Sequence, residues 1–443
     1  MHHTVEDMPQ QLDRTAIPQN VQPSPQGPMD RADSNWPLWQ VGAFRWIFAY
    51  LTLYSFDSFL EVLRIFNWLR DVCKPVSHVV TQAFAKSVLH LDIASFTSYS
   101  DDLYNYVHCL ILAIVATVIT IVWSLLQPNK REHNRLYSWF RLIMQVHVGA
   151  TVLSYGMAKV VPCQFPPLDA LTLSKPVGEY APAGLLWATM GYSQLYTIFG
   201  GITEVVGAFL LMLPRTYLAG SLLTFAVMVN VLMFNLSYGI GVKLLSLHLL
   251  AGAAVVFAPD LKGVIQSLVW RKRFQPASFA TFFRNRKFNT CVLAMQIFLA
   301  VSWTVDQVFY VLNRYERQNA AHVHNEDGLW IVEKQKIDGR EPSSADEESL
   351  RWGRLALGKE KLVIQNTVGD RKEYSLDRND SPIAIMNNGK QFGTFSFEFE
   401  ESDANHPRMR ATVNGHTIWC ALRAVPIQDF PLNQEKFSWV SRR

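Results

Sequence analysis

The sequence predicts a membrane all-α helical bundle of about seven transmembrane helices, followed by a small antiparallel β-barrel-like domain. Three observations predict this fold. Of the 443 residues, 49% are hydrophobic and only 18% are charged. The long apolar runs are confined to residues 41–312. Residues 313–443 contain short alternating segments separated by turn residues, which is typical of strands joined by hairpins. We therefore expect a transmembrane domain over residues 38–315 and a β-rich domain over residues 316–443.

The first 37 residues are rich in Pro and Gln and contain no apolar run. This composition predicts a disordered arm rather than a cleaved secretory signal. The first membrane helix would then direct insertion by itself.

Seven apolar segments approach the length of a membrane span. They are Val41–Leu60, Leu103–Leu126, Leu136–Val161, Tyr196–Leu213, Tyr217–Asn235, Lys243–Phe257 and Phe288–Leu312. The polar, amphipathic stretch Arg64–Asp102 predicts interfacial helices between the first two spans. Pro162 is expected to end the third span, and Pro259 with Asp260 the sixth.

Two short loops, Gln127–Arg135 and Leu261–Lys287, are markedly basic. Both fall on the same side of the membrane if the amino terminus is cytoplasmic. The positive-inside rule therefore predicts a multi-pass protein with its amino terminus inside and its carboxy-terminal domain outside the cytoplasm.

The third span carries a polar stripe at helical spacing. Arg141, Gln145, Tyr155 and Lys159 fall on one face, and His147 lies beside them. A charge near the centre of the bilayer costs roughly 2.5–3.5 kcal/mol, so this face must turn toward protein or a wet cavity. Arg141 and Arg45 lie near the inner surface, where contact with lipid phosphate is the simplest interpretation.

The predicted topology gathers acids and bases of several spans in the outer half of the membrane, with Glu204 deeper. We expect them to form a polar ligand pocket open to the outside. Its candidate residues are Asp57, Glu61, His147, Tyr155, Lys159, Glu204, Lys243, His248 and Asp306.

The sequence leaves alternatives open for these residues. Lys159 and Glu204 either bind a polar head group or form a structural ion pair between the third and fourth spans. His248 is either a buried core histidine or a proton relay or metal ligand.

Five cysteines, at positions 73, 109, 163, 291 and 420, are spread out without a CxxC motif. The sequence also lacks a CxxCH haem motif, a flavin fingerprint and a metal-ligand spacing, so the cofactor is unknown. Cys73 and Cys163 fall in loops expected on the same outer side, where both a disulfide and two free thiols fit. The net charge of +4 is attributed to cytoplasmic loops, and no nucleic-acid partner is expected.

The motif YGMAK at Tyr155–Lys159, followed by TEVVGAFLLMLPRTYLAGSLL at Thr203–Leu223, resembles the DoxX-like membrane family. The resemblance covers about Leu136–Asp260. The matching positions are Arg141, Gly156, Lys159, Glu204, Gly207 and the apolar hairpin after Arg215.

The segment Asn235–Asp260 looks more like larger relatives that approach the HTTM domain of vitamin K-dependent carboxylases. The carboxy-terminal region resembles the β-rich appendage of some bacterial DoxX-like proteins. The resemblance implies a bacterial inner-membrane protein linked to respiratory or thiol redox work, with a quinone as a conceivable cofactor and a soluble or membrane redox partner.

Three functions are compatible with these features. The first is a non-catalytic membrane subunit or partner of a redox system that holds a quinone or other lipid-soluble ligand. The second is a lipid-binding transporter or scaffold. The third is a membrane enzyme on a lipid-soluble substrate, in which Lys159 acts as a base.

Overall fold

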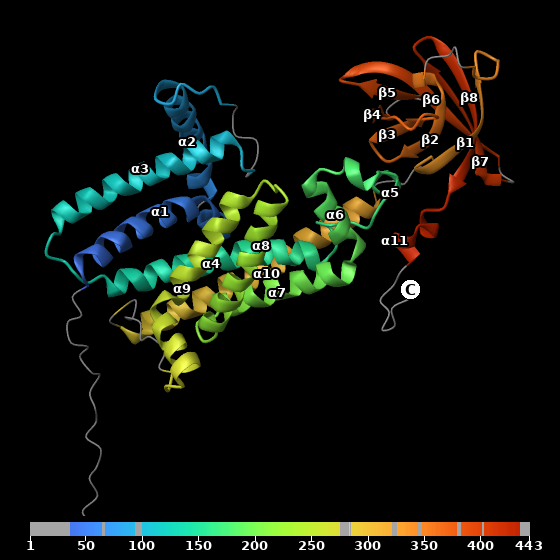
Figure 1. The fold of residues 1–443 in the computed structure, drawn as a ribbon. Coiled ribbons are helices and arrows are strands. Elements are labelled where there is room, and N and C mark those ends of the chain that lie inside the picture. Colours follow the sequence, from blue (N-terminus) through green and yellow to red (C-terminus); the bar gives the residue numbers. More distant parts are fainter. Residues whose placement is uncertain are drawn as a thin grey trace, which may run out of the picture.

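The computed structural model describes residues 36–63, 67–93, 100–274, 283, 285–320, 326–343, 348–378, 382–400 and 403–434. These residues form a helical bundle followed by a closed β-barrel (Figure 1). The amino-terminal arm expected over residues 1–37 lies outside the described residues, apart from Trp36 and Pro37.

Seven long helices run back and forth along the bundle (Figure 1). They are α1 (Leu38–Leu63), α3 (Leu103–Leu126), α4 (Asn134–Val160), α7 (Gln194–Met212), α8 (Tyr217–Ser237), α9 (Lys243–Trp270) and α10 (Arg286–Ala320). Three further helices are α2 (Asn67–Ser87), which lies in the stretch expected to be interfacial, and the short α5 (Ala170–Leu173) and α6 (Pro182–Tyr192) between α4 and α7. The loop after α3 lies at the opposite end of the bundle from the barrel (Figure 1).

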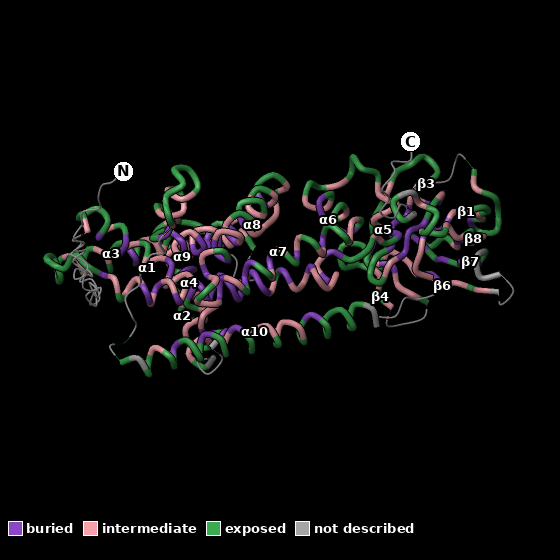
Figure 2. The backbone as a smooth tube through the Cα atoms, turned by 90° about the horizontal axis from the view of Figure 1, so that it is seen from below, coloured by how far each residue is buried: buried purple, intermediate pink, exposed green. Residues whose placement is uncertain are grey.

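Five described helices, α3, α7, α8, α9 and α10, are long and apolar enough to cross a membrane. This corrects the expected count of seven, because α1 and α4 are helices but do not reach that apolarity. The reason is clearest in α4, where fourteen of 27 residues are buried, among them Ser138, Gln145 and His147. In Figure 2 the buried colour is concentrated along α4. A helix that faces mostly protein can carry polar residues that a lipid-facing helix cannot.

Helix α9 does not end at Pro259 as expected but continues to Trp270. A proline inside a helix leaves the carbonyl four residues earlier without its usual donor. Here the hydroxyl of Tyr137 donates to that carbonyl, the Val255 oxygen, at 2.5 Å. Asp260, the second residue expected to stop the helix, is buried and accepts a hydrogen bond from the Tyr217 hydroxyl at 2.8 Å.

Small residues set the crossing of α4 and α7. A Cβ atom on Gly156 would lie 2.9 Å from the Cβ of Glu204, and one on Gly201 would lie 2.8 Å from the Cβ of Lys159. Glycine at both positions lets the two backbones touch, as at small-residue contacts between membrane helices. The contact places Lys159 and Glu204 at the same level of the bundle.

The β-domain is a closed antiparallel barrel in which each strand pairs with the next and the last pairs with the first. Its strands are β1 (Gly328–Ile337), β2 (Trp352–Leu357), β3 (Lys361–Asn366), β4 (Arg371–Asp377), β5 (Ile383–Asn387), β6 (Lys390–Glu400), β7 (Asp403–Val413) and β8 (His416–Val425). The expected small antiparallel barrel is confirmed. Its hairpins at Asn388-Gly389 and Asn414-Gly415 have positive φ at both residues, as a two-residue hairpin turn requires.

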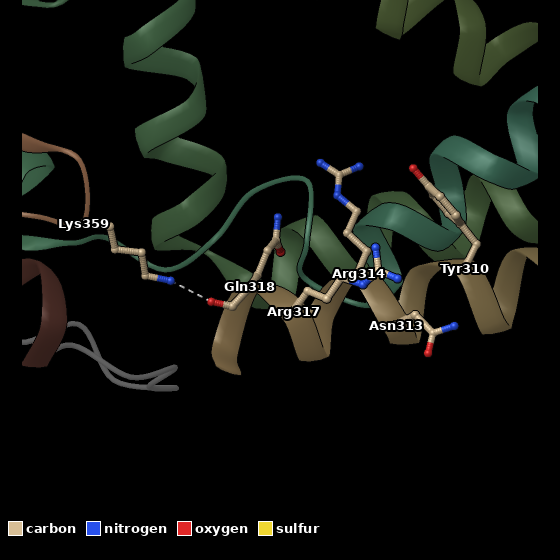
Figure 3. A pocket seen from close by; sticks show the side chains of 6 residues that line it. All are labelled: Tyr310, Asn313, Arg314, Arg317, Gln318 and Lys359. Carbon is tan, nitrogen blue, oxygen red and sulfur yellow. Dashed lines mark hydrogen bonds between the residues drawn. The ribbon is translucent and has the colours of Figure 1, made fainter. Parts of the chain in front are cut away.

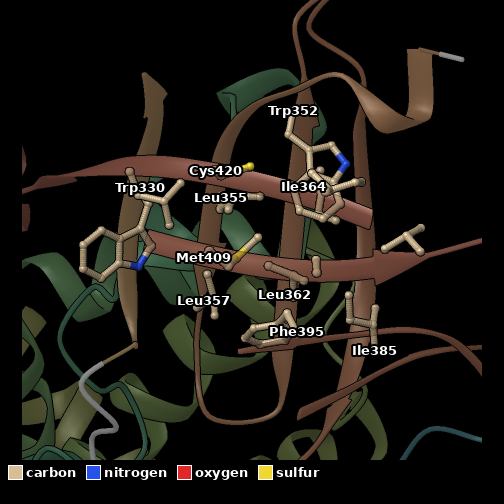
Figure 4. Packing of buried hydrophobic residues seen from close by; sticks show 14 of the residues in the cluster. Trp330, Trp352, Leu355, Leu357, Leu362, Ile364, Ile385, Phe395, Met409 and Cys420 are labelled. Carbon is tan, nitrogen blue, oxygen red and sulfur yellow. The ribbon is translucent and has the colours of Figure 1, made fainter. Parts of the chain in front are cut away.

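Alternate strand residues point into the barrel and fill it (Figure 4). On β2, Leu355 and Leu357 belong to this interior cluster, whereas Ala356 packs outside against α5. Large side chains, including Trp352 of β2 and Phe395 of β6, complete the interior. The barrel is therefore stabilised by a packed apolar core.

The barrel rests on the segment between α4 and α7. Leu171 of α5 packs on the outer face of β1–β3, where a Cβ on Gly358 would lie 2.7 Å from it. Arg371 of β4 binds Glu179 at 3.3 Å and Ser174 at 3.2 Å. A small helix, α11 (Pro431–Gln434), follows the barrel.

Candidate functional site

Lys159 and Glu204 form an ion pair in which the Lys159 Nζ donates to Glu204 Oε1 at 2.5 Å. The two residues are 9% and 3% exposed, so the pair is withdrawn from solvent. Glu204 Oε2 is also buried and has no hydrogen-bond partner among the described residues. A buried carboxylate oxygen without a donor is costly, typically by about 1–3 kcal/mol.

The pair lines a cavity of about 380 Å³ between α4, α6, α7, α8 and α9, which we call the Glu204 cavity. Tyr155 lines the same cavity. The remaining wall is mainly apolar and aromatic, and includes Val152, Phe165, Leu186, Trp187, Met190, Phe199, Val231, Phe234, Leu245 and Leu249. A mainly apolar cavity that also contains a few polar groups is typical of a site for a small molecule.

The Glu204 cavity borders the surface of the bundle. Phe199 is 60% exposed and Tyr196 is 47% exposed, yet both line the cavity. Both belong to α7, one of the five helices apolar enough to span a membrane. A molecule dissolved in lipid could therefore reach the cavity from the side.

Asp57 and Glu61 do not join the Glu204 cavity. Both lie at the end of α1 and pair with α2: Asp57 with Arg70 at 3.5 Å and Lys74 at 3.7 Å, and Glu61 with Arg70 at 3.6 Å. These contacts attach α2 to the bundle.

Lys243 has a structural role at the start of α9. Its Nζ lies 3.3 Å from the carboxylate of Asp101. The same carboxylate accepts hydrogen bonds from the backbone N–H groups of Lys243 at 2.6 Å and Leu244 at 3.0 Å. Asp101 thus satisfies donors in the first turn of α9 that have no partner within the helix.

His248 is fully hydrogen-bonded by protein. Its Nδ1 lies 2.6 Å from the Leu244 carbonyl oxygen, which can only accept, so Nδ1 carries the proton. Its Nε2 then accepts from the Tyr50 hydroxyl at 2.7 Å. The ring also stacks on Tyr54 with centroids 3.6 Å apart. The arrangement favours the buried core histidine over a metal ligand.

His147 and Asp57 line a second cavity of about 350 Å³, between α1, α2, α3, α4 and α9, which we call the His147 cavity. Leu245 lines both cavities. Asp306 lies half-buried on α10 and is not among the residues that line either cavity. The nine residues expected in one pocket are thus not gathered at one site. Tyr155, Lys159 and Glu204 line the Glu204 cavity, Asp57 and His147 line the His147 cavity, and the other four line neither.

A third hollow, of about 520 Å³, lies where α10 meets the barrel. Figure 3 shows Arg314 and Arg317 on α10 and Lys359 on the barrel, with the Lys359 Nζ donating to the Gln318 carbonyl at 2.8 Å. Both arginines are exposed. Exposed cations at the end of a membrane helix are typical of side chains at the level of the lipid head groups.

Arg45 and Arg141 bind protein rather than extending to lipid as expected. Arg45 is 3% exposed and donates to Ser124 at 3.0 Å and to the carbonyls of Gln127 at 3.1 Å and Lys130 at 3.2 Å. It thereby satisfies acceptors at the end of α3. Arg141 lies over the ring of Tyr217, with its Cζ 4.4 Å from the centroid.

The described part of the chain holds no group of three or more His, Cys, Asp or Glu side chains able to bind a metal. All five cysteines are free thiols, so Cys73 and Cys163 are not paired. The sequence did not identify the aromatic walls of the Glu204 cavity. Trp187, for example, lies on α6 between two long helices, and only the fold brings it into the wall of the cavity.

Comparison with families of known proteins finds no matching family model. No solved structure matches the chain. Among curated proteins, the uncharacterized protein YwoB of Bacillus subtilis (strain 168) is 33% identical over 115 residues, which is 24% of this chain and 67% of that protein. The name of this relative assigns no activity.

Proposed function

We propose that this chain, which belongs to the same family as the Bacillus subtilis protein YwoB, binds a lipid-soluble molecule in the Glu204 cavity. The molecule would carry a hydrogen-bonding head group, as a quinone does. The observation that carries this proposal is the buried Glu204 Oε2, which has no hydrogen-bond partner among the described residues and belongs to a side chain that lines a mainly apolar cavity. A hydroxyl or N–H group of a bound molecule, such as a hydroxyl of the reduced form of a quinone, would supply that donor.

The chemistry of the cavity supports this class of ligand. The Lys159 ammonium binds the carboxylate and Tyr155 lines the same cavity, so the cavity offers both donors and an acceptor. The aromatic walls suit a ring or an isoprenoid chain, and the volume lies within the range of small-molecule sites. The exposed Phe199 at the rim fits entry from the bilayer.

We place the protein in a bacterial inner membrane, with the amino terminus cytoplasmic and the barrel outside. Support comes from the basic loop after α3, which lies at the end of the bundle opposite the barrel. The positive-inside rule favours this orientation. In that membrane the protein would be a non-catalytic subunit or partner of a redox system.

One observation favours the alternative of a lipid-binding transporter. Leu245 lines both cavities, so the two are separated by few side chains. The packed barrel interior gives no support to carriage of the ligand by the β-domain. An enzyme that uses Lys159 as a base is disfavoured, because Glu204 already holds its ammonium group.

Mass spectrometry of small molecules extracted from the protein purified in mild detergent tests the proposal. The test variant is Lys159→Met/Glu204→Gln, which removes both charges together and leaves no buried ion unpaired. The matched control is Lys361→Met/Glu373→Gln, which removes an equally short ion pair on the exposed barrel surface. We expect an apolar molecule in the wild type and the control but not in the test variant. The same bulk lipid in all three proteins would contradict the proposal.

A further inference from the structure

The His147 cavity is separate from the Glu204 cavity and differs from it in chemistry. It lies between α1, α2, α3, α4 and α9 and has a volume of about 350 Å³. Its one ion-pair network, Asp57 with Arg70 and Lys74, joins α1 to α2. The side chain of His147 enters it from α4.

His147 is 3% exposed, and both of its ring nitrogens are buried without a hydrogen-bond partner among the described residues. Another imidazole of the cavity is different, because His108 Nδ1 lies 3.2 Å from the Thr81 hydroxyl. A neutral imidazole carries one donor and one acceptor, and buried polar groups of this kind are nearly always satisfied. The position of His147 therefore fits a group that pairs with a molecule bound in the cavity.

The surroundings of His147 indicate the charge of such a molecule. The His147 ring packs edge-on against the Tyr54 ring, with centroids 6.3 Å apart. The neighbouring His248 already has its hydrogen-bond partners, the Tyr50 hydroxyl and the Leu244 carbonyl. Asp57 is the charged residue of α1 that lines the cavity, one helical turn after Tyr54. It is already paired with Arg70 and Lys74. The charges that line the cavity, Asp57, Arg70 and Lys74, are already engaged in ion pairs, so a neutral hydroxyl or carbonyl can bind to His147 without displacing one of them.

We propose that the His147 cavity is a second ligand site, which binds a neutral lipid-soluble alcohol or ketone through a hydrogen bond to the imidazole of His147. The apolar body of the molecule would lie against Leu53, Leu112 and Leu244, which line the same cavity. The assignment does not depend on the Glu204 cavity, since the two sites share only Leu245.

Photolabelling of the full-length protein in detergent with 4-(hydroxymethyl)benzophenone tests this inference. The probe is a neutral alcohol whose ketone inserts into nearby C–H bonds under light. We expect saturable labelling of peptides that contain residues 53–60 or 104–112, which line the His147 cavity. At sub-saturating probe, His147→Leu should reduce that labelling roughly threefold to tenfold, as the loss of one hydrogen bond predicts. His147→Gln, which keeps a donor and an acceptor, should retain more labelling than His147→Leu.

Two further measurements separate binding from a structural role. Because His147 makes no hydrogen bond within the described protein, His147→Leu should not lower the melting temperature. Leu112→Trp fills the cavity from α3 and leaves His147 in place, so it should also remove the labelling. Labelling that persists in both variants would overturn the inference. Labelling confined to residues 226–235, which line only the Glu204 cavity, would overturn it while leaving the proposed function intact.

Discussion

Gly156 of α4 and Gly201 of α7 touch through their backbones: a Cβ atom on Gly201 would lie 2.8 Å from the Gly156 carbonyl oxygen. Lys159 and Glu204 follow these glycines by three residues on their respective helices, and so they face each other. The geometry of the candidate site therefore depends on two residues that contribute no functional group.

Gly201→Ala should separate α4 from α7 and destabilise the protein by about 1–3 kcal/mol, because the added methyl group meets backbone atoms that cannot move easily. Gly200→Ala is the matched control, since a Cβ atom there meets nothing within 4 Å. Thermal or denaturant unfolding in detergent measures both. Equal stability of the two variants would contradict the close contact between α4 and α7 at Gly201.

The ion pair predicts non-additive mutations. Lys159→Met and Glu204→Gln should each lower the free energy of unfolding, by about 3–5 kcal/mol where the change leaves a buried charge without its partner. The double variant should lose less than the sum of the two single losses. A double-mutant cycle on melting curves measures the coupling, and additive losses would show that the two residues act independently.

His133, in the loop before α4, predicts a dependence of stability on pH. Burial, and then the charges of Arg45 and Lys130, lower the pKa of His133 to about 4. Its Nε2 accepts a hydrogen bond from Arg45 at 3.3 Å, and protonation would remove that acceptor. The unfolded chain, with an ordinary pKa near 6.5, binds the proton first, so stability should fall as the pH drops from about 6.5 to 4.

Melting temperatures at pH 7 and pH 4.5 measure this effect. His133→Asn removes the titrating group and should reduce the difference between the two temperatures. If the melting temperatures of the wild type and His133→Asn depend on pH in the same way, other groups cause the loss of stability in acid.

The packed barrel interior predicts a large cost for truncating Phe395, which is 1% exposed. Phe395→Ala should destabilise the barrel by about 3–5 kcal/mol. Val368→Ala, at a position 63% exposed, should change stability by less than about 0.5 kcal/mol. Circular dichroism of β-structure during unfolding distinguishes the two, and a small loss for Phe395→Ala would indicate a loosely filled interior.

The β-barrel was predictable from the sequence because its signals are local. Strand alternation has a period of two residues, and the Asn414-Gly415 dipeptide specifies its own hairpin. The membrane helices were predictable where they face lipid, as in α3. Helix α4 was assigned as a span that its composition does not support, because apolarity reports contact with lipid and α4 contacts mostly protein.

The candidate site was only partly predictable. Helical spacing and chain order placed Lys159 and Glu204 on adjacent spans, and the structure pairs them. Depth in the membrane, however, does not give the direction in which a side chain points around its helix. Asp57 therefore turned out to face Arg70 of α2, and Lys243 to face Asp101.

The most direct test of the central claim is native mass spectrometry of the intact protein and of Val231→Phe, which fills the Glu204 cavity without touching the ion pair. We predict that the wild type carries an apolar mass adduct that Val231→Phe lacks. The cavity-filling variant of the other site, Leu112→Trp, should retain this adduct. Identical adducts on the wild type and Val231→Phe would contradict the assignment of the Glu204 cavity as a ligand site.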